Sequence, residues 1–219
     1  MDLVTINTKD GLFLDAAWYP SSGSTMGAIL VHGRAQNFYT SVVRWLAPYL
    51  SKAGFSSLAL NMRDHDHNEI DGIPGAVHDI EAGVNFLRDQ GIQKFLLVGV
   101  SYGSNKAVLY LSEVGNQDRL LGLVLLSTGG IRTNLPELWI EVIQKLQNSR
   151  FPLLVIQAGA DEHVSQPKEA GEELIKASAN STKTHLVVID GANHGFSNHQ
   201  EETYEEINNW LFLNNWLKH

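Results

Sequence analysis

The chain has no cysteine among its 219 residues. Disulfide bonds, cysteine-ligated zinc and a thiol nucleophile are therefore excluded. Basic residues are also few, since 16 Lys and Arg stand against 24 Asp and Glu and the formal net charge is -8. A protein that binds nucleic acid needs basic surface to neutralise phosphates, so we expect no nucleic-acid partner.

Long apolar runs are missing as well. No segment approaches the roughly 18 to 20 uninterrupted apolar residues of a membrane-spanning helix, so we expect no membrane span. The first residues, MDLVTINTKDG, have an acidic second position and alternating apolar residues, which is unlike a signal peptide. We therefore expect a soluble, cytoplasmic protein, although a removed targeting sequence would leave no trace.

The composition suits a single domain. A chain of this length with 43% hydrophobic residues can bury one sizeable core. It contains no internal repeat, no low-complexity tract and no linker long enough to separate two domains. We expect one domain over residues 1–219, and the sequence carries no signal for an oligomeric state.

The spacing of apolar residues predicts the strands. Residues 3–7 and 12–20 alternate on either side of a turn at 9–11, which is typical of an antiparallel hairpin at the edge of a sheet. Short and nearly continuous apolar runs follow, as expected for strands buried on both faces of a parallel sheet. These runs are 27–33, 55–62, 94–101, 120–128, 151–161 and 184–191.

Segments with helical spacing lie between these runs, at 41–54, 76–91 and 103–115, and a terminal helix is expected over 201–219. Gly91 and Gly115 are suited to helix C-caps. Alternating strands and helices predict an α/β fold with a doubly wound, mostly parallel sheet, whose active site forms outside the carboxyl ends of the strands. The expected packing face of the terminal helix is Ile207, Trp210, Leu211 and Trp216.

Three polar residues follow predicted strands. Ser101 is the centre of a Gly-x-Ser-x-Gly motif, placed where an apolar strand meets a helical pattern, as a nucleophile on a sharp turn requires. Asp161 and His194 follow two later strands, in the chain order serine, acid, histidine. A serine hydroxyl needs a base within hydrogen-bond reach, and that imidazole needs a carboxylate to orient it. The sequence thus predicts a catalytic triad of Ser101, His194 and Asp161.

With His32-Gly33 at the end of an earlier strand, these motifs resemble the α/β-hydrolase superfamily. The other landmarks are the Gly-x-Ser-x-Gly around Ser101, AGADEHV around Asp161 and GANHGF around His194, and the set spans residues 32 to 196. The N-terminal hairpin also fits this family. The resemblance implies an α/β-hydrolase fold that carries a serine hydrolase site.

The resemblance also implies roles for neighbouring residues. The backbone N–H groups of Arg34 and Tyr102 would form the oxyanion hole, and His32 would be structural. Glu162 could replace Asp161 as the acid, but the family pattern places the acid three residues before a hydrophobic residue, here Val164, and favours Asp161. An arginine at position 34 departs from the pattern, and its side chain either favours an acidic acyl or leaving group or points into solvent.

Two segments are candidates for substrate binding. Residues 64–67, Asp-His-Asp-His, include metal-ligand types, yet adjacent loop residues seldom converge on one ion, so we expect no metal and no cofactor. The resemblance places this loop at the border of the active site, where His65 would line the pocket. The interval 131–150 holds about one helix, so we expect a minimal cap, with Leu138 and Trp139 either covering the acyl pocket or packing on the sheet.

The expected activity is hydrolysis of carboxylic esters of a small acyl substrate through an acyl-enzyme, without a cofactor. A thioesterase or an acyltransferase would use the same triad and the same intermediate. A non-catalytic binding protein of this fold is a further alternative, which the intact set of serine, histidine and aspartate disfavours.

Overall fold

The structure is a computed structural model that describes residues 1–66, 73–113, 118–181 and 183–217. His67, at the end of the polar cluster, and Gly115, an expected helix cap, lie outside these residues. None of the helices in the described ranges has the length and the apolar composition needed to cross a membrane.

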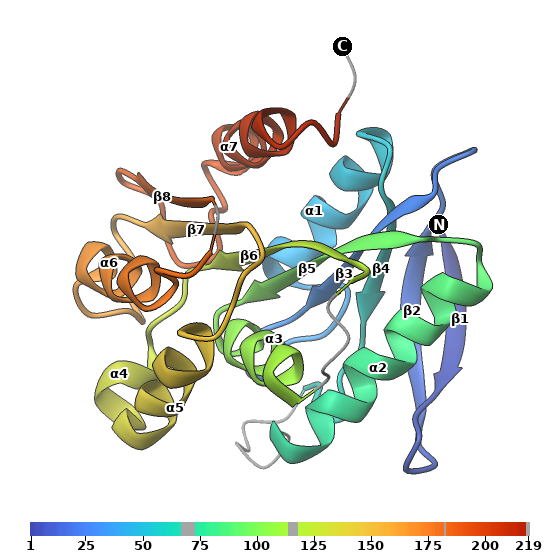
Figure 1. Ribbon diagram of the computed structural model, residues 1–219, viewed down its shortest axis with the longest axis horizontal. Helices are drawn as coiled ribbons and strands as arrows, with labels where there is room; N and C mark the ends of the chain where they lie inside the picture. The colour runs from blue at the N-terminus through green and yellow to red at the C-terminus, as the bar shows by residue number, and fades with distance from the viewer. Residues whose placement is uncertain (67–72, 114–117, 182, 218–219) are drawn as a thin grey trace.

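The described residues form one eight-stranded sheet in the order β1-β2-β4-β3-β5-β6-β7-β8 (Figure 1). The hairpin β1–β2 is antiparallel and joins β4 antiparallel, while every other neighbouring pair is parallel. This confirms the predicted α/β fold with an N-terminal hairpin at the sheet edge. The strands are β1 (Asp2–Asn7), β2 (Phe13–Tyr19), β3 (Met26–Val31), β4 (Ser56–Leu60), β5 (Lys94–Val100), β6 (Leu120–Leu126), β7 (Leu153–Ala158) and β8 (Thr184–Ile189).

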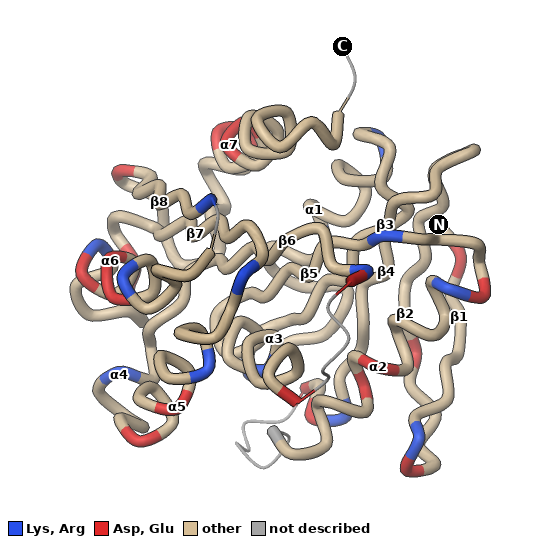
Figure 2. Tube along the Cα trace, in the orientation of Figure 1, with Lys and Arg blue, Asp and Glu red and all other residues tan. Residues whose placement is uncertain are grey.

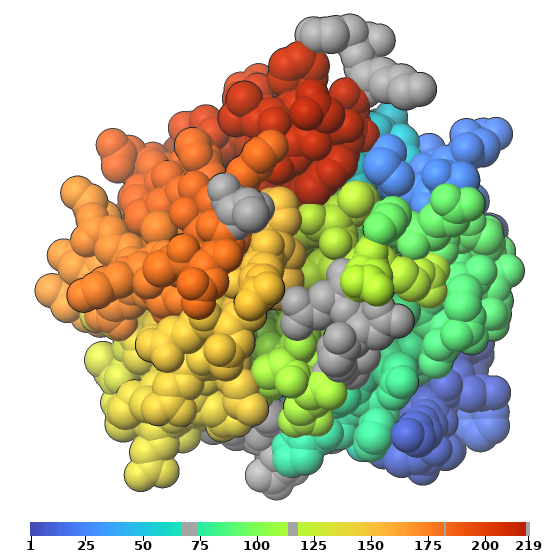
Figure 3. All heavy atoms as spheres, viewed as in Figure 1, coloured from blue at the N-terminus to red at the C-terminus, as the bar shows by residue number. Residues whose placement is uncertain are grey.

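The central strands are apolar on both faces because helices cover both sides of the sheet (Figure 1). Within β5, Leu97 belongs to the core on one face, and Leu96 and Val98 belong to the core on the other. The first face carries α2 (Ile73–Asp89), α3 (Tyr102–Glu113), α5 (Pro136–Leu146) and α6 (Pro167–Ala177). The second face carries α1 (Ser41–Lys52) and α7 (Gln200–Leu213), and Figure 3 shows α7 lying directly against the segment that contains β8.

Each predicted parallel strand is present. Each strand ends one to three residues before the end of the apolar run that predicts it. The run 94–101, for example, ends as a strand at Val100, and the run 151–161 ends as a strand at Ala158. The residues left over form the turns at the carboxyl edge of the sheet. Ser101 and Asp161 therefore stand in turns that the apolar pattern alone assigns to strands, whereas His194 lies beyond the run that predicts β8.

The helices differ from the prediction in two places. Helix α6 was not predicted, although Pro167 in its first turn, Glu169 near its start and Lys176 near its end are ordinary helix signals. The terminal helix ends at Leu213 instead of continuing to the end of the chain. Trp216 nevertheless packs edge-on against Trp210, with 5.1 Å between ring centroids. The expected packing face is confirmed, with its last member beyond the helix.

The connection from β6 to β7 contains only the short α4 (Ile131–Asn134) and α5. This connection, residues 127–152, is described throughout and has no room for a separate lid domain. The carboxyl edge of the sheet thus stays open beside α4, as the minimal cap predicted from the sequence requires.

Candidate active site

Ser101 occupies a strained turn between β5 and α3. Its φ of 52° lies in the left-handed region, which a residue with a side chain seldom adopts. Its N–H donates to the carbonyl of Leu126 at 2.8 Å, and its carbonyl accepts from the N–H of Ser104 at 3.0 Å. These bonds hold the turn against β6 and leave the side chain of Ser101 at the wall of a cavity.

Two glycines make this turn possible. A Cβ on Gly103 would overlap the carbonyl oxygens of Val31 and His32, so α3 can approach β3 only without a side chain there. A Cβ on Gly99 would lie 2.5 Å from the Cα of Ser104. The Gly-x-Ser-x-Gly motif therefore has a steric cause, because α3 touches β5 at Gly99 and the end of β3 at Gly103.

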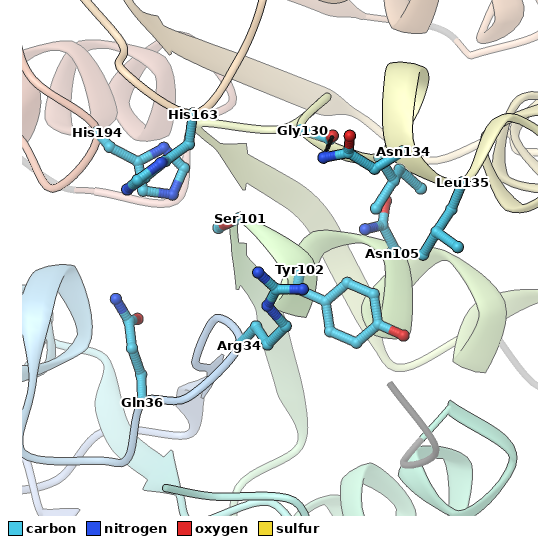
Figure 4. Close-up of a pocket in the computed structure, with 11 residues that line it drawn as sticks. Arg34, Gln36, Ser101, Tyr102, Asn105, Gly130, Asn134, Leu135, His163 and His194 are labelled. Atoms are coloured by element: carbon cyan, nitrogen blue, oxygen red, sulfur yellow. Dashed lines mark hydrogen bonds between the residues drawn. The ribbon is translucent and has the colours of Figure 1, made fainter. Parts of the chain in front are cut away.

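His194 and Asp161 form a bonded pair beside this turn (Figure 4 shows His194). The Nδ1 atom of His194 lies 2.9 Å and 2.8 Å from the two carboxylate oxygens of Asp161. The Oδ1 atom of Asp161 also accepts the backbone N–H groups of His163, at 2.8 Å, and Val164, at 2.9 Å. A carboxylate fixed in this way favours the tautomer in which Nδ1 carries the proton and donates it to Asp161. Nε2 is then the unprotonated, basic nitrogen of the ring.

Glu162 contacts the same histidine through the backbone. Its Oε2 accepts the N–H of His194 at 3.0 Å, and this bond lowers the pKa of the Glu162 carboxyl. Asp161 thus contacts the imidazole of His194, whereas Glu162 contacts the backbone N–H of the same residue.

Ser101 and His194 line a common cavity of about 280 Å³ (Figure 4). Among the described residues they share no hydrogen bond. Ile131, in the short helix α4, and Leu135, just after it, form the apolar part of the cavity wall. The remaining wall is largely polar. It includes Arg34, Gln36, Asn105, Asn134 and His163.

The three predicted substrate-binding residues lie outside the cavity wall. Trp139 is 6% exposed, and its indole N–H donates to Glu173 at 2.8 Å. Leu138 packs against the core, and the Nδ1 of His65 lies 2.9 Å from the carboxylate of Asp66. The reason is the position of the cap: α5 turns its apolar face onto the core, so that α4 and Leu135, the residue before α5, border the cavity instead.

Sequence reasoning missed Gln36, Asn105 and Asn134 as cavity residues. A signal existed for Asn105, which follows Ser101 by about one helical turn and so faces the same side of α3. Gln36 belongs to an irregular connection and Asn134 to the four-residue helix α4, and neither is long or regular enough for periodicity to mark the direction of a side chain.

The polar cluster after β4 consists of paired charges. The Lys106 Nζ lies 2.5 Å and 2.6 Å from the two carboxylate oxygens of Asp64, and both side chains are buried. Arg63 bridges Asp10 and Asp79. No group of metal-binding side chains occurs in the part of the chain that the structure describes. The Asp64–Lys106 pair ties this loop to α3, the helix that follows Ser101.

His32 is fully buried at the end of β3. Its Nδ1 donates to the carbonyl of Gly33 at 2.8 Å, and its Nε2 accepts the N–H of Met62 at 3.0 Å. Only a neutral ring can make both bonds, and burial lowers the pKa of His32 to about 4. His32 thus joins the strand ends of β3 and β4, which is the structural role expected from the sequence.

We expect acid to destabilise the fold through His32. The unfolded chain binds a proton near pH 6.5 and the folded chain only near pH 4, so stability falls as the pH drops through this window. The loss of unfolding free energy between pH 7 and pH 5 is about 2 kcal/mol. Guanidinium unfolding at both pH values checks this. His32→Gln should remove that part of the slope, whereas His185→Gln, on the exposed side of β8, should keep it; an equal slope in all three proteins contradicts the assignment.

The family model described as alpha/beta hydrolase fold matches residues 29–147, more than half of the chain. No curated protein sequence matches the chain.

Solved structures resemble the fold closely at low sequence identity. The esterase Pf2001 of Pyrococcus furiosus is 24% identical, with a TM-score of 0.78 over 96% of this chain and 91% of the esterase. Est1E of Butyrivibrio proteoclasticus is 18% identical, with a TM-score of 0.80 over 98% of this chain and 99% of that one. XC6422 of Xanthomonas campestris, an α/β serine hydrolase without a lid, is 20% identical, with a TM-score of 0.76 over 100% and 95%. The family match and this shared architecture agree, and the chain belongs to the α/β-hydrolase fold family.

Proposed function

We propose that this protein is a serine hydrolase that cleaves carboxylic esters of small acyl substrates. The observation that carries the proposal is the meeting of two groups at one cavity: Ser101 on its strained turn, and His194 held by Asp161. A serine hydroxyl is a weak nucleophile at neutral pH and becomes useful only beside an oriented base. Ser101 and His194 both line the cavity, where a substrate can reach them.

In the proposed reaction the Ser101 hydroxyl turns toward Nε2 of His194 and attacks the ester carbonyl. The proton passes to His194, which then gives it to the departing alcohol, leaving an acyl-enzyme. A water molecule, deprotonated by His194, attacks the acyl carbon and releases the acid and the free Ser101. Asp161 stabilises the imidazolium that forms in each half of the reaction.

Backbone N–H groups of Arg34 and Tyr102 form the proposed oxyanion hole. Both residues line the cavity beside Ser101. Tyr102 is the first residue of α3, so its N–H stands at the positive end of the helix dipole. Negative charge that develops on the carbonyl oxygen would be stabilised there without any rearrangement of the protein.

The absence of a lid domain between β6 and β7 supports small substrates. The cavity of about 280 Å³ suits a short acyl chain. The similarity to an esterase of Pyrococcus furiosus and to a lidless serine hydrolase of Xanthomonas campestris is consistent with this class of substrate.

Labelling with a fluorophosphonate tests the activated serine. We expect wild-type protein to gain one probe mass per chain, because the reagent reacts with a serine that an adjacent base activates. Ser101→Ala should gain none. Ser165→Ala, which removes an exposed hydroxyl beside the Asp161 loop, is the matched control and should be labelled fully. Folded wild-type protein that stays unlabelled, or Ser101→Ala that is labelled, contradicts the proposed function.

A further inference from the structure

The cavity wall has a charge opposite to that of the protein. The chain carries a net charge of -8, and Figure 2 shows acidic residues on the outer helices α2, α6 and α7. None of the described residues that line the cavity is acidic, whereas Arg34 is always positively charged. A cavity of this kind attracts anions in a molecule that otherwise repels them.

The guanidinium of Arg34 is available for a ligand. It forms no ion pair with any residue in the described ranges, while Arg63 and Arg132 each bind carboxylates. Figure 4 shows the side chain reaching from the loop after β3 toward Tyr102, next to Ser101. Guanidinium groups bind carboxylates through two parallel hydrogen bonds, so this side chain is suited to a carboxylate on the substrate.

Asn105 makes the inner wall unsuited to a plain alkyl chain. The residue is 1% exposed, it lines the cavity, and its Oδ1 is buried without a hydrogen-bond partner among the described residues. Asn134 contributes a second carboxamide to the same wall (Figure 4). An alkyl chain would leave the carboxamide of Asn105 unpaired, whereas a chain that ends in a carboxylate can accept from the NH₂ group of Asn105.

We propose that the preferred substrates are half-esters of short dicarboxylic acids, with the free carboxylate at the end of the acyl chain bound by Arg34. This inference rests on the proposed esterase activity and names its substrate class. The reaction is unchanged: water cleaves the ester, the alcohol leaves, and the product is a dicarboxylate. Arg34 then has two roles, since its backbone N–H faces the oxyanion and its side chain selects the acyl group.

Two isosteric esters test the inference. Monoethyl succinate and ethyl 4-methylpentanoate have the same shape, because two methyl groups replace the two carboxylate oxygens. With proton release followed in a pH-stat, we expect wild-type kcat/KM to be about tenfold higher for monoethyl succinate, the effect of one charge-assisted contact. Arg34→Gln should remove most of this preference, and added salt should weaken it. Arg150→Gln removes the same charge at an exposed position away from the cavity wall and should keep the preference.

Succinate binding to Ser101→Ala protein separates this inference from the proposed function, because binding needs no turnover. We expect calorimetry to detect binding that is lost in Ser101→Ala/Arg34→Gln. If wild type is labelled by fluorophosphonate and hydrolyses the two esters equally, the substrate class is wrong and the esterase function stands. If wild type is neither labelled nor active but succinate still binds through Arg34, the esterase function is wrong and the anion site stands. Succinate that fails to bind overturns the inference in either case.

Discussion

Ser101→Ala is expected to lower kcat for ester hydrolysis by about 10⁴- to 10⁶-fold, because the acyl-enzyme can no longer form. His194→Ala should cost a similar factor, since the hydroxyl then has no base. The two residues act as one unit, so the double variant should be hardly slower than either single variant. Steady-state rates on a short activated ester, corrected for the uncatalysed reaction, measure all three.

Two comparisons make this result interpretable. Ser165→Ala should retain wild-type kcat, and thermal unfolding should show that Ser101→Ala remains folded, since the replaced hydroxyl faces the cavity and not the core. Relief of the positive φ at position 101 is not expected, because alanine is strained there as serine is. A Ser101→Ala protein with more than about a hundredth of wild-type kcat would mean that another group is the nucleophile.

The sequence could single out Ser101, Asp161 and His194 as neighbours because their positions depend on topology. In a parallel sheet, the ends of β5, β7 and β8 lie on one edge, so residues that follow these strands can meet although they are far apart in sequence. The apolar runs located those strand ends to within three residues. The glycines around Ser101 added a steric requirement that few other turns have.

The cavity wall was harder to predict, because many of its residues lie in irregular connections or in the short helix α4. Leu138 and Trp139 have apolar side chains in the expected cap, but the hydrophobic face of α5 is buried against the core. Asn134, just before α5, lines the cavity instead. Periodicity shows which side of a helix is apolar and does not show which surface that side covers.

The charge pairs near the site also depend on tertiary contacts. Asp64 and Lys106 are distant in sequence, and nothing in either segment indicates a partner. Burying a charged lysine or aspartate is unfavourable unless the two charges are paired. The pairing of Asp64 with Lys106 therefore becomes apparent only when the fold brings the two residues together.

Asp161→Asn is expected to reduce kcat/KM by about 10³- to 10⁴-fold. This is more than the loss of one negative charge alone would cause. The reason is the set of donors around the carboxylate. Oδ1 accepts two backbone N–H groups, from His163 and Val164, so the single oxygen of asparagine is held at that position. The NH₂ group then takes the place of Oδ2, which lies 2.8 Å from Nδ1 of His194.

A hydrogen-bond donor at that position favours the other tautomer of the His194 imidazole. When Nδ1 accepts a hydrogen bond from this NH₂ group, the ring proton moves to Nε2, and Nε2 can no longer accept the proton of Ser101. The retained oxygen, 2.9 Å from Nδ1, still supports the original tautomer in a minor fraction of the molecules. Glu162→Gln is the matched control, because a glutamine oxygen can still accept the backbone N–H of His194, and its rate should stay within about tenfold of wild type. Fluorophosphonate labelling rates measured on both variants decide between the carboxylates. If Glu162→Gln were the slow variant and Asp161→Asn the fast one, the acid of the triad would be Glu162, and the bond between Asp161 and the imidazole would have no catalytic role.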